Sequence, residues 1–464
     1  MSLIGEVVAG RRRTDAGWLV VAVAIGVLVV LAVHDITAKS FWYDEAMSLT
    51  LARLAPDRLL AALAGREANG SLYFAVLSVW RMLGEGEARI RFLSVVFAGA
   101  TIPLLYVVGR RHVGAAAAIL GCALFAVNPF LIEFAQEARG YTMAIFLTTA
   151  AVLAWSFATK DDRARSWSAY AVLSVAALYT HIFCGFVALG LGITWLLGAA
   201  PRTRSGLVAQ GAIVVAALPL AGFVALSGFD QIDWILPISQ AGVSAVLGGV
   251  AAGSLVLALL LYGAALVSIP SREAARWRRL APLIAWWLTP LVAGIGISTF
   301  RSLLEPRYFI VALPAMLLLA SAGFVRVGTT IGRERGAALA GVVALVLVVA
   351  LSAGPLLEWY EAPRFDWRGA AGWVARDTRP GDRIAYIPVH ARTPMGIYLD
   401  RYTDGPPVET TIDELRENPH RAWLVLYLIR GVRYDGLEAT LPGYRVVESK
   451  FFDGVRVQLI ERSG

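Results

Sequence analysis

Long apolar runs separated by short polar segments dominate the first 354 residues of the chain. A transmembrane helix needs about 20 mostly apolar residues. Eleven runs come near this length, at 18–33, 92–109, 113–128, 141–158, 167–180, 182–199, 206–226, 243–268, 280–299, 307–325 and 337–354. The pattern predicts an all-α polytopic membrane protein with about 11 transmembrane helices.

The polar stretch between the first two runs contains two further candidate helices. One covers about 50–64, where leucines recur at near-helical spacing. The other covers 72–83, which is short and carries Trp80 and Arg81 near its end. We expect both to lie along the membrane surface as juxtamembrane helices of the first outer loop rather than to cross the membrane.

The pattern changes at about residue 355, where charge density rises and turn signals appear. We expect a helix over Trp367–Arg376 and strands over Ile384–Val389 and Trp423–Ile429. The strands Tyr444–Glu448 and Val455–Ile460 flank Asp453-Gly454, which is a hairpin signal. The chain therefore divides into a membrane domain, 1–354, and a small extracytoplasmic α/β domain, 355–464.

The positions of the few charged residues predict how the chain is oriented in the membrane. Apolar residues make up 58% and charged residues 16%, with a mean hydropathy of +0.64, which excludes an ordinary soluble enzyme. The net charge of +8 would suit nucleic acid, but the positive residues stand in short clusters between apolar runs. If 72–83 does not span, the clusters at 11–13, 110–111, 160–165, 202–204, 272–279 and 326–335 share one side. The positive-inside rule then places the N-terminus in the cytoplasm and the C-terminal domain outside.

Charged residues beside spans are costly and commonly functional, and an unusual set falls on the outer side. Asp44 and Glu45 follow the first span, and either carboxylate suits a general base acting on a hydroxyl group. On residue type alone, the favoured alternative is an acidic pair that caps the helix that follows. The loop Asp230–Trp234, with Trp234 as a candidate contact, is expected to shape substrate binding.

Two outer segments combine glutamate, arginine and tyrosine. They are Glu137-Ala138-Arg139-Gly140-Tyr141 and Glu305-Pro306-Arg307-Tyr308. Arginine beside acidic and aromatic groups suits a phosphate or phosphodiester. The alternative for Arg139 is an arginine that reaches the interface and pairs with Glu137. Arg91 fits a membrane anchor as well as a ligand contact, and His181 fits a structural histidine as well as a functional one.

Motifs of other reaction classes are missing from the sequence. It contains no metal-ligand spacing of the HExxH or CxxC kind, no P-loop, no dinucleotide fingerprint and no GxSxG. A soluble nucleotide donor is therefore disfavoured, whereas an anionic lipid donor suits an outer site rimmed by arginines. No cofactor is expected, and a divalent metal held by Asp44 and Glu137 is an alternative that we do not favour.

The order of the motifs resembles the GT-C polyprenyl-phosphate-sugar glycosyltransferases, above all the family-39-like bacterial enzymes, protein O-mannosyltransferases and the lipid A aminoarabinose transferase. The matching pieces lie between residue 41 and about residue 400. They are Trp42–Glu45, Leu72–Phe74, Ala88–Ser94, Pro103–Tyr106, Gly109–Gly114, Asn128–Phe130, Gln136–Tyr141, Tyr179–His181, Pro306–Tyr308 and Asp366–Ala371. One departure is Asn69-Gly70-Ser71, where many relatives carry His-Pro-Pro or Lys-Pro-Pro.

The resemblance implies an inverting glycosyltransferase in a bacterial cytoplasmic membrane. Asp44, with Glu45 beside it, would serve the acceptor, and Arg91, Arg139 and Arg307 would contact the donor phosphate. Glu137, Tyr141, His181, Tyr308 and Trp234 would contact substrate. The partners would be a polyprenyl-phosphate sugar, with mannose or arabinose as the guess, a glycan, lipid or protein acceptor, and membrane lipids, with no nucleic acid. A transporter or flippase of a lipid-linked glycan is the alternative, but it predicts charges deep inside spans.

Overall fold

The computed structural model describes residues 3–65, 68–227, 235, 237–269, 274–417, 421–428, 441 and 443–462. Its contacts divide the chain into two compact units. The first, here called the helical unit, comprises residues 1–34, 55–80 and 91–360. The second, here called the α/β unit, joins residues 35–54 and 81–90 to residues 361–464. Each unit is described by itself.

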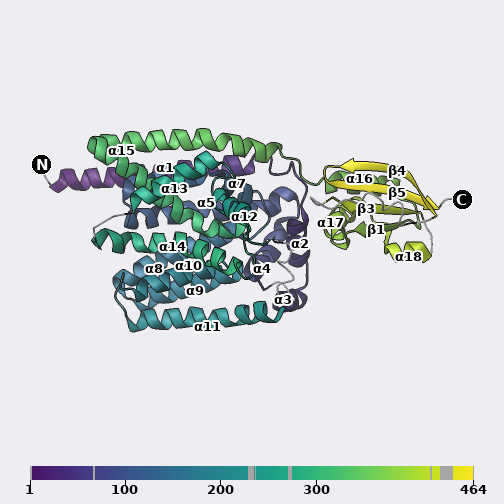
Figure 1. Cartoon of the computed structure of the whole chain (residues 1–464), viewed down its shortest axis with the longest axis horizontal. Coiled ribbons are helices and arrows are strands. Elements are labelled where there is room, and N and C mark those ends of the chain that lie inside the picture. The colour runs from purple at the N-terminus through teal and green to yellow at the C-terminus, as the bar shows by residue number, and fades with distance from the viewer. Residues whose placement is uncertain are drawn as a thin grey trace. The chain divides into compact units, whose positions relative to one another are not determined.

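Helices that run side by side build the helical unit (Figure 1). Its main helices are α1 (Leu3–Val33), α5 (Glu87–His112), α6 (Ala115–Ala126), α7 (Pro129–Ala135), α8 (Tyr141–Asp161), α9 (Ala164–Thr180), α10 (Cys184–Leu196), α11 (Arg204–Ser227), α12 (Gln240–Gly249), α13 (Leu255–Ser268), α14 (Ala274–Ser298) and α15 (Leu313–Glu361). The short helix η3 (Pro306–Ala312) precedes α15. Every run that the sequence predicts as a span therefore coincides with helix.

The predicted number of eleven spans is not confirmed. In the described part of the chain, six helices are long and apolar enough to cross a membrane, or seven if the bent pair α6 and α7 forms one span. Helices α10 and α13 have 13 and 14 residues, well below the usual length of a span. The predicted span 243–268 is broken into α12 and α13, whereas 307–325 and 337–354 both lie in the long segment that ends with α15.

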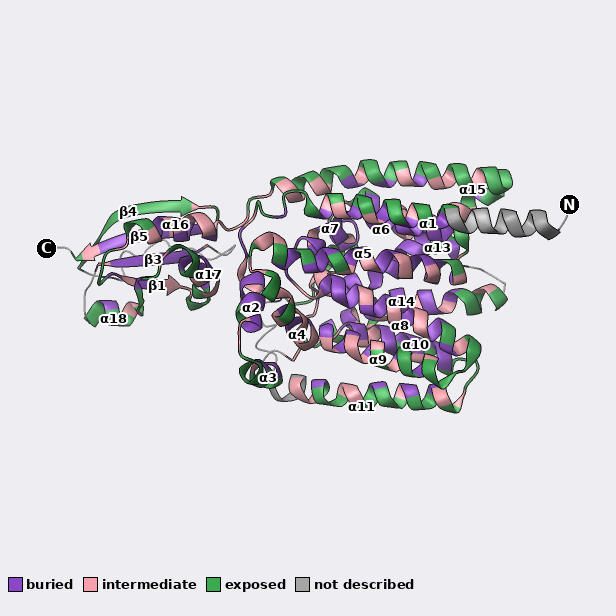
Figure 2. Cartoon of the chain, turned by 180° about the vertical axis from the view of Figure 1, so that it is seen from behind, coloured by how far each residue is buried: buried purple, intermediate pink, exposed green. Residues whose placement is uncertain are grey.

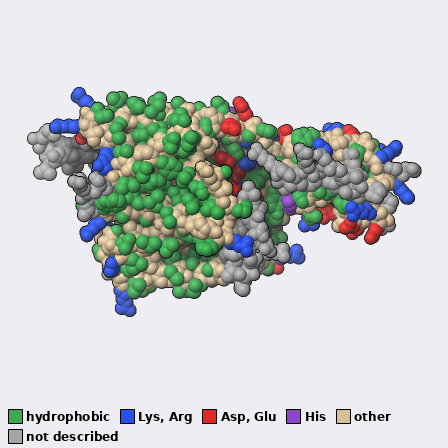
Figure 3. Space-filling view, viewed as in Figure 1, with side chains coloured by type: hydrophobic (Ala, Val, Ile, Leu, Met, Phe, Trp, Pro, Cys, Tyr) green, Lys and Arg blue, Asp and Glu red, His purple; other side chains and the backbone are tan. Residues whose placement is uncertain are grey.

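Burial follows position in the helical unit. Side chains of the inner helices and of the first part of α15, Leu313–Gly323, are buried, while α11 and the later part of α15 are largely exposed (Figure 2). Hydrophobic side chains cover the face seen in Figure 3, and Lys and Arg side chains gather at one end of this unit. An apolar exterior is expected of a surface that contacts hydrocarbon, so the helical unit has the surface of a polytopic membrane protein.

A glycine and a kink shape the long helix α15. The backbone leaves the helical conformation at Gly332 and at Arg333, whose φ of +50° lies in the left-handed region. A Cβ added at Gly323 would lie 1.8 Å from the carbonyl oxygen of Ala264 in α13. Only glycine permits this close packing of two helix backbones.

Helices form where the two juxtamembrane helices are predicted, but with other bounds, and their position at the membrane surface stays a prediction. Instead of one helix over 50–64, the chain forms α2 (Tyr43–Ala52) and α3 (Pro56–Gly65). Proline is favoured in the first turn of a helix and disfavours helical conformation in the residue before it, so Pro56 separates the two. The stretch 72–83 forms α4 (Ser71–Trp80) followed by the short helix η1 (Arg81–Leu83).

The α/β unit contains a five-stranded sheet with the order β2-β1-β3-β5-β4. The strands are β1 (Arg383–Ile387), β2 (Val408–Glu409), β3 (Ala422–Tyr427), β4 (Tyr444–Phe452) and β5 (Val455–Arg462). Strand β1 pairs in parallel with β2 and β3, whereas β5 pairs antiparallel with β3 and β4. The Asp453-Gly454 hairpin is confirmed, and both residues have positive φ. Ile429, the expected end of β3, lies outside the described residues.

Helices complete this unit. The predicted helix appears as α16 (Trp367–Asp377), capped by the Asp366 carboxylate, which accepts a hydrogen bond from Gly369 N at 2.9 Å. Two more helices, α17 (Arg392–Tyr402) and α18 (Ile412–Glu417), were not predicted from the sequence. Helix α17 is amphipathic only weakly, but it supplies the buried Tyr398 that is described below.

Candidate active site

Three segments far apart in sequence meet at one end of the helical unit. Tyr141 begins α8, His181 follows the last residue of α9, and Tyr308 lies in η3. The Tyr141 and His181 rings have centroids 5.6 Å apart, and those of His181 and Tyr308 are 5.4 Å apart. Antiparallel packing of α8 and α9 explains the meeting, because the start of one helix lies beside the end of the other.

Two arginines lie at this aromatic group. Burial, together with the nearby positive charges of Arg139 and Arg307, lowers the pKa of the His181 imidazole to about 3. Arg307 Nε also lies 3.4 Å from Glu305 Oε1. We call the set Glu137, Arg139, Tyr141, His181, Arg307 and Tyr308 the basic–aromatic cluster. It unites six of the predicted site residues around a histidine that stays neutral at physiological pH.

Arg91 lies in the helix that anchors one edge of this cluster. Its side chain is buried, with 2% exposed, in α5. Ser94, one turn further on, donates a hydrogen bond to the carbonyl oxygen of Glu137 at 2.5 Å and lies 3.4 Å from that of Arg139. Ser94 thereby fixes the segment that carries both Glu137 and Arg139. Ser94 belongs to the Ala88–Ser94 motif that carries the family resemblance, but no role for it was predicted from the sequence.

The Asn69–Tyr73 segment, which departs from the family pattern, packs on the same region. Asn69 Oδ1 accepts a hydrogen bond from Ile182 N at 3.0 Å, and Ser71 donates one to the carbonyl oxygen of Tyr179 at 3.3 Å. A Cβ added at Gly140 would lie 3.1 Å from Tyr73 Cβ. Asn69 therefore orders the backbone beside His181, a role that sequence reasoning missed.

The acidic pair belongs to the α/β unit and stands in the first turn of α2. Glu45 is fully buried, and its carboxylate accepts a hydrogen bond from Trp42 N at 3.3 Å. This is the capping arrangement that the sequence left open for the pair. Asp44 is half-buried, so its carboxylate is the more accessible of the two. A catalytic role for either residue stays a prediction.

A hydrogen-bond network inside the α/β unit holds the start of α2. The hydroxyl of Tyr398 in α17 accepts a hydrogen bond from Phe41 N at 2.8 Å and donates one to Glu87 Oε1 at 2.7 Å. Glu87 also pairs with Arg368 at 3.3 Å and Arg401 at 3.4 Å. The residues from α16 and α17 thus fix the backbone two residues before the turn that carries Asp44.

A second ion-pair group lies in the same unit. Glu85 accepts hydrogen bonds from Arg53 and pairs with Arg81. Burial alone would raise the pKa of the Glu85 carboxyl. Arg53 and Arg81 donate hydrogen bonds to this carboxylate and add positive charge beside it, so its pKa is lower than the ordinary value. These contacts tie the end of α2 to the 81–90 segment.

The predicted contact in the 230–234 loop and the alternative of a bound metal remain to be considered. Trp234, a predicted substrate contact, lies outside the described residues, as do Asp230 and Asp233. Among the residues that the structure describes, no group of three or more His, Cys, Asp or Glu side chains could hold a metal ion.

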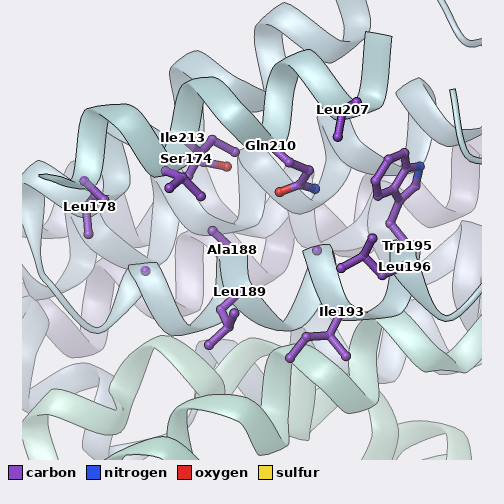
Figure 4. A pocket seen from close by; sticks show the side chains of 14 residues that line it. Ser174, Leu178, Ala188, Leu189, Ile193, Trp195, Leu196, Leu207, Gln210 and Ile213 are labelled. Atoms are coloured by element: carbon purple, nitrogen blue, oxygen red, sulfur yellow. The ribbon is translucent and has the colours of Figure 1, made fainter. Parts of the chain in front are cut away.

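An apolar groove of about 340 Å³ lies between α9, α10 and α11 (Figure 4). Leu178, Leu189, Ile193 and Trp195 line it, and Gln210 adds an amide group. Its lining contains no ionisable group, so it offers nothing for acid–base or phosphate chemistry. The basic–aromatic cluster, not this groove, is the candidate active site.

Comparison with known proteins relates this geometry to a family. Residues 71–227, which include most of the basic–aromatic cluster, match the family described as "Dolichyl-phosphate-mannose-protein mannosyltransferase". No curated protein matches the chain in a search by sequence.

Solved structures share the fold at low sequence identity. ArnT from Cupriavidus metallidurans in the apo state has 15% identity and a TM-score of 0.62, covering 96% of this chain and 98% of that chain. The same protein bound to undecaprenyl phosphate has 16% identity and a TM-score of 0.57, covering 99% and 98%. The mycobacterial arabinofuranosyltransferase AftD has 17% identity and a TM-score of 0.56, covering 96% of this chain and 41% of that chain. The chain therefore has the GT-C glycosyltransferase fold, which confirms the resemblance drawn from its motifs.

Proposed function

We propose that this protein is an inverting membrane glycosyltransferase that moves a sugar from a polyprenyl-phosphate donor to an acceptor hydroxyl group. The basic–aromatic cluster carries the proposal, because it gathers two arginines and neutral hydrogen-bonding groups at one end of a bundle of apolar helices. A lipid-linked phosphate needs both features: an apolar surrounding for the chain and cations for the head group. The ArnT structure bound to undecaprenyl phosphate shows that a protein of this fold binds such a lipid.

The proposed reaction is a single displacement at the anomeric carbon. The acceptor oxygen forms a bond to this carbon while the bond from the carbon to the phosphate oxygen breaks, with inversion of configuration. The acceptor proton passes to the Asp44 carboxylate, and polyprenyl phosphate leaves. Negative charge grows on the leaving phosphate, so Arg139 and Arg307 stabilise the transition state more than the ground state. Arg91 is the third proposed phosphate contact.

The neutral cluster residues take a different part. Because burial and the two arginines keep His181 uncharged, it can donate or accept a hydrogen bond but adds no positive charge. Tyr141 and Tyr308 flank it with polar hydroxyl groups and aromatic faces, which suit a sugar ring. We assign these three residues, together with Glu137, to the transferred sugar. The sugar itself, with mannose or arabinose as the guess, and the class of acceptor belong to the proposal.

A binding measurement tests the phosphate role apart from turnover. Purified protein is titrated with undecaprenyl phosphate and with undecaprenol, which lacks the phosphate. Wild-type protein should prefer the phosphate form, and Arg139→Gln and Arg307→Gln should each lose this preference. Arg301→Gln, an exposed arginine near η3, serves as the matched control and should keep it. An unchanged preference in the double variant would remove the arginines from the donor site.

A transfer assay tests the base. Radiolabelled polyprenyl-phosphate sugars are supplied with membrane extract as the source of acceptor, and labelled product is counted. Asp44→Asn should abolish transfer while leaving donor binding intact, since the carboxylate acts on the acceptor. Transfer at the wild-type rate by this variant would exclude Asp44 as the base.

A further inference from the structure

A second pocket, of about 200 Å³, lies at the other end of α8 from the basic–aromatic cluster. It is lined by the end of α5, the end of α8, the loop after α10 and the start of α14. Its lining residues include Arg111, His112, Trp155, Lys160, Arg278 and Arg279. Four of them are cations, and none is a carboxylate. We call this the basic pocket.

The position of the basic pocket matches a membrane surface. Tyr141 begins α8 in the basic–aromatic cluster, and Lys160 stands next to the last residue of that helix. An α-helix rises 1.5 Å per residue, so the two ends of this 21-residue helix are about 30 Å apart. The hydrocarbon core of a bilayer has about the same thickness. The basic pocket therefore lies at the surface opposite the candidate active site, at the level of lipid head groups.

The wall and floor of this pocket are fixed by contacts. His112 Nδ1 lies 2.7 Å from the carbonyl oxygen of Arg279, and His112 Nε2 lies 2.7 Å from the Ser156 hydroxyl. Arg111 donates a hydrogen bond to the carbonyl oxygen of Ser156 at 2.9 Å, and its guanidinium lies 4.1 Å from the centre of the Phe157 ring. These bonds join α5, α8 and α14 and hold Arg111 in place.

The cations of the pocket can be compared with the carboxylates of the described residues. Within the described part of the chain, Lys160, Arg278 and Arg279 have no carboxylate partner. Among the described residues, Asp161 and Asp162 follow Lys160, and their oxygens are bound elsewhere. Asp161 accepts hydrogen bonds from Arg163 N and Ser166, and Asp162 accepts one from Trp167. Four cations that share a small pocket repel one another, and a bound anion would relieve this repulsion.

A neutral donor is present as well. Trp155, which is 3% exposed and lines the pocket, has an indole N–H without a hydrogen-bond partner among the described groups. A buried N–H that lacks a partner is costly, and a phosphate oxygen is a strong acceptor. Trp155 thus places an unpartnered N–H in the wall of a pocket that four cations also line.

We propose that the basic pocket binds the phosphate group of an anionic phospholipid in the leaflet opposite the candidate active site. Its depth at the bilayer surface favours a lipid phosphate over a soluble one, because the acyl chains can lie in hydrocarbon along the exposed apolar faces of the helices. Basic pockets between helix ends are the usual form of such a site. The inference stands without the proposed glycosyl transfer, since it uses other residues at the other end of the unit.

The test uses the full chain in detergent and measures the lipids retained and the unfolding midpoint. Phosphatidylglycerol should bind and raise the midpoint, whereas phosphatidylcholine should not. Each surface cation contributes about 1 kcal/mol to binding of an anionic lipid, so Arg278→Gln/Arg279→Gln should weaken phosphatidylglycerol binding roughly 30-fold. Arg333→Gln/Arg335→Gln removes two exposed arginines outside the pocket and should have little effect.

A titration with inorganic phosphate distinguishes a lipid phosphate from a soluble phosphate as the ligand. Stabilisation by inorganic phosphate equal to that by phosphatidylglycerol would overturn the lipid assignment and point to a soluble anion. Equal loss of binding in both double variants would show a general surface attraction, and it would also overturn the proposal. Lys160→Gln, a single change at the rim, repeats the test if the double variant does not fold.

Discussion

At the residue scale, the candidate active site depends on chemistry that the sequence shows only in part. The residue types around Arg139 and Arg307 predicted an anion site, because arginine, acid and tyrosine recur in two outer segments. The neutral state of His181 could not be predicted, since it follows from burial and from arginines that are distant in sequence. Ser94 and Asn69 were missed because their roles are hydrogen bonds to backbone groups of remote segments.

His181 gives the first prediction, on pH. Its folded pKa of about 3 lies below the ordinary 6.5, so as the pH falls below about 6.5 the unfolded chain binds a proton that the folded chain does not. This group therefore costs stability at acidic pH, by up to about 1.4 kcal/mol per pH unit. The unfolding midpoint of His181→Gln should fall less between pH 7 and pH 5 than that of the wild type. Equal falls would show that His181 is protonated when folded.

At the element scale, the periodicity of apolar residues located the helices but not their breaks. The sequence predicted one helix over 50–64, whereas Pro56 divides it, and two predicted spans lie in the one long segment that ends with α15. Hydropathy cannot show where a helix bends, because the break at Gly332 and Arg333 depends on how the parts of α15 before and after it pack. The small helices α17 and α18 have too weak a pattern to predict.

Helix α15 gives the second prediction, on packing. A methyl group at Gly323 would meet the backbone of Ala264, which cannot move aside as a flexible side chain could. Gly323→Ala should therefore destabilise the protein by at least about 1–3 kcal/mol, as an overpacked core does. Gly341→Ala, in the part of α15 beyond the kink at Gly332 and Arg333, is the control, since nothing lies within 4 Å of an added Cβ there. The measurement is the unfolding midpoint of each variant in detergent. Equal midpoints for the two variants would contradict the close packing at Gly323.

Helix α17 gives the third prediction, on the position of α2. Tyr398→Phe removes the hydroxyl that accepts from Phe41 N and donates to Glu87. Phe41 N then loses its acceptor in a buried position, whereas Glu87 keeps its pairs with Arg368 and Arg401. One unsatisfied buried N–H should cost about 1–3 kcal/mol. Hydrogen exchange over residues 41–52 should accelerate, and transfer should slow. Tyr402→Phe, whose side chain is 45% exposed on the same helix, should behave as wild type; slow exchange in both variants would count against the network.

At the scale of the whole molecule, composition and charge established more than any motif did. The low fraction of charged residues predicted a membrane protein. The clusters of arginine predicted that the loops that carry them lie on the same side of the membrane. Contacts in the structure group residues 35–54 and 81–90 with the C-terminal sheet, which no local pattern reveals. Such grouping depends on Tyr398 and Glu87, two residues that are more than 300 positions apart.

Orientation gives the fourth prediction. Cys122 and Cys184 are both buried, so the wild-type protein should resist a membrane-impermeant thiol reagent. In intact cells stripped of outer layers, Arg445→Cys should react, because its side chain is 70% exposed in the C-terminal sheet. Arg163→Cys, in the loop between α8 and α9, should react only after the membrane is permeabilised. The reverse pattern would invert the proposed topology.

The rate of sugar transfer from a purified polyprenyl-phosphate donor tests the central claim most directly. Loss of one group that stabilises developing negative charge slows such reactions about 10²–10³-fold. Arg139→Gln and Arg307→Gln should each slow transfer to this extent, while Arg301→Gln should match the wild type. Transfer at the wild-type rate by the Arg139→Gln/Arg307→Gln double variant would contradict the account.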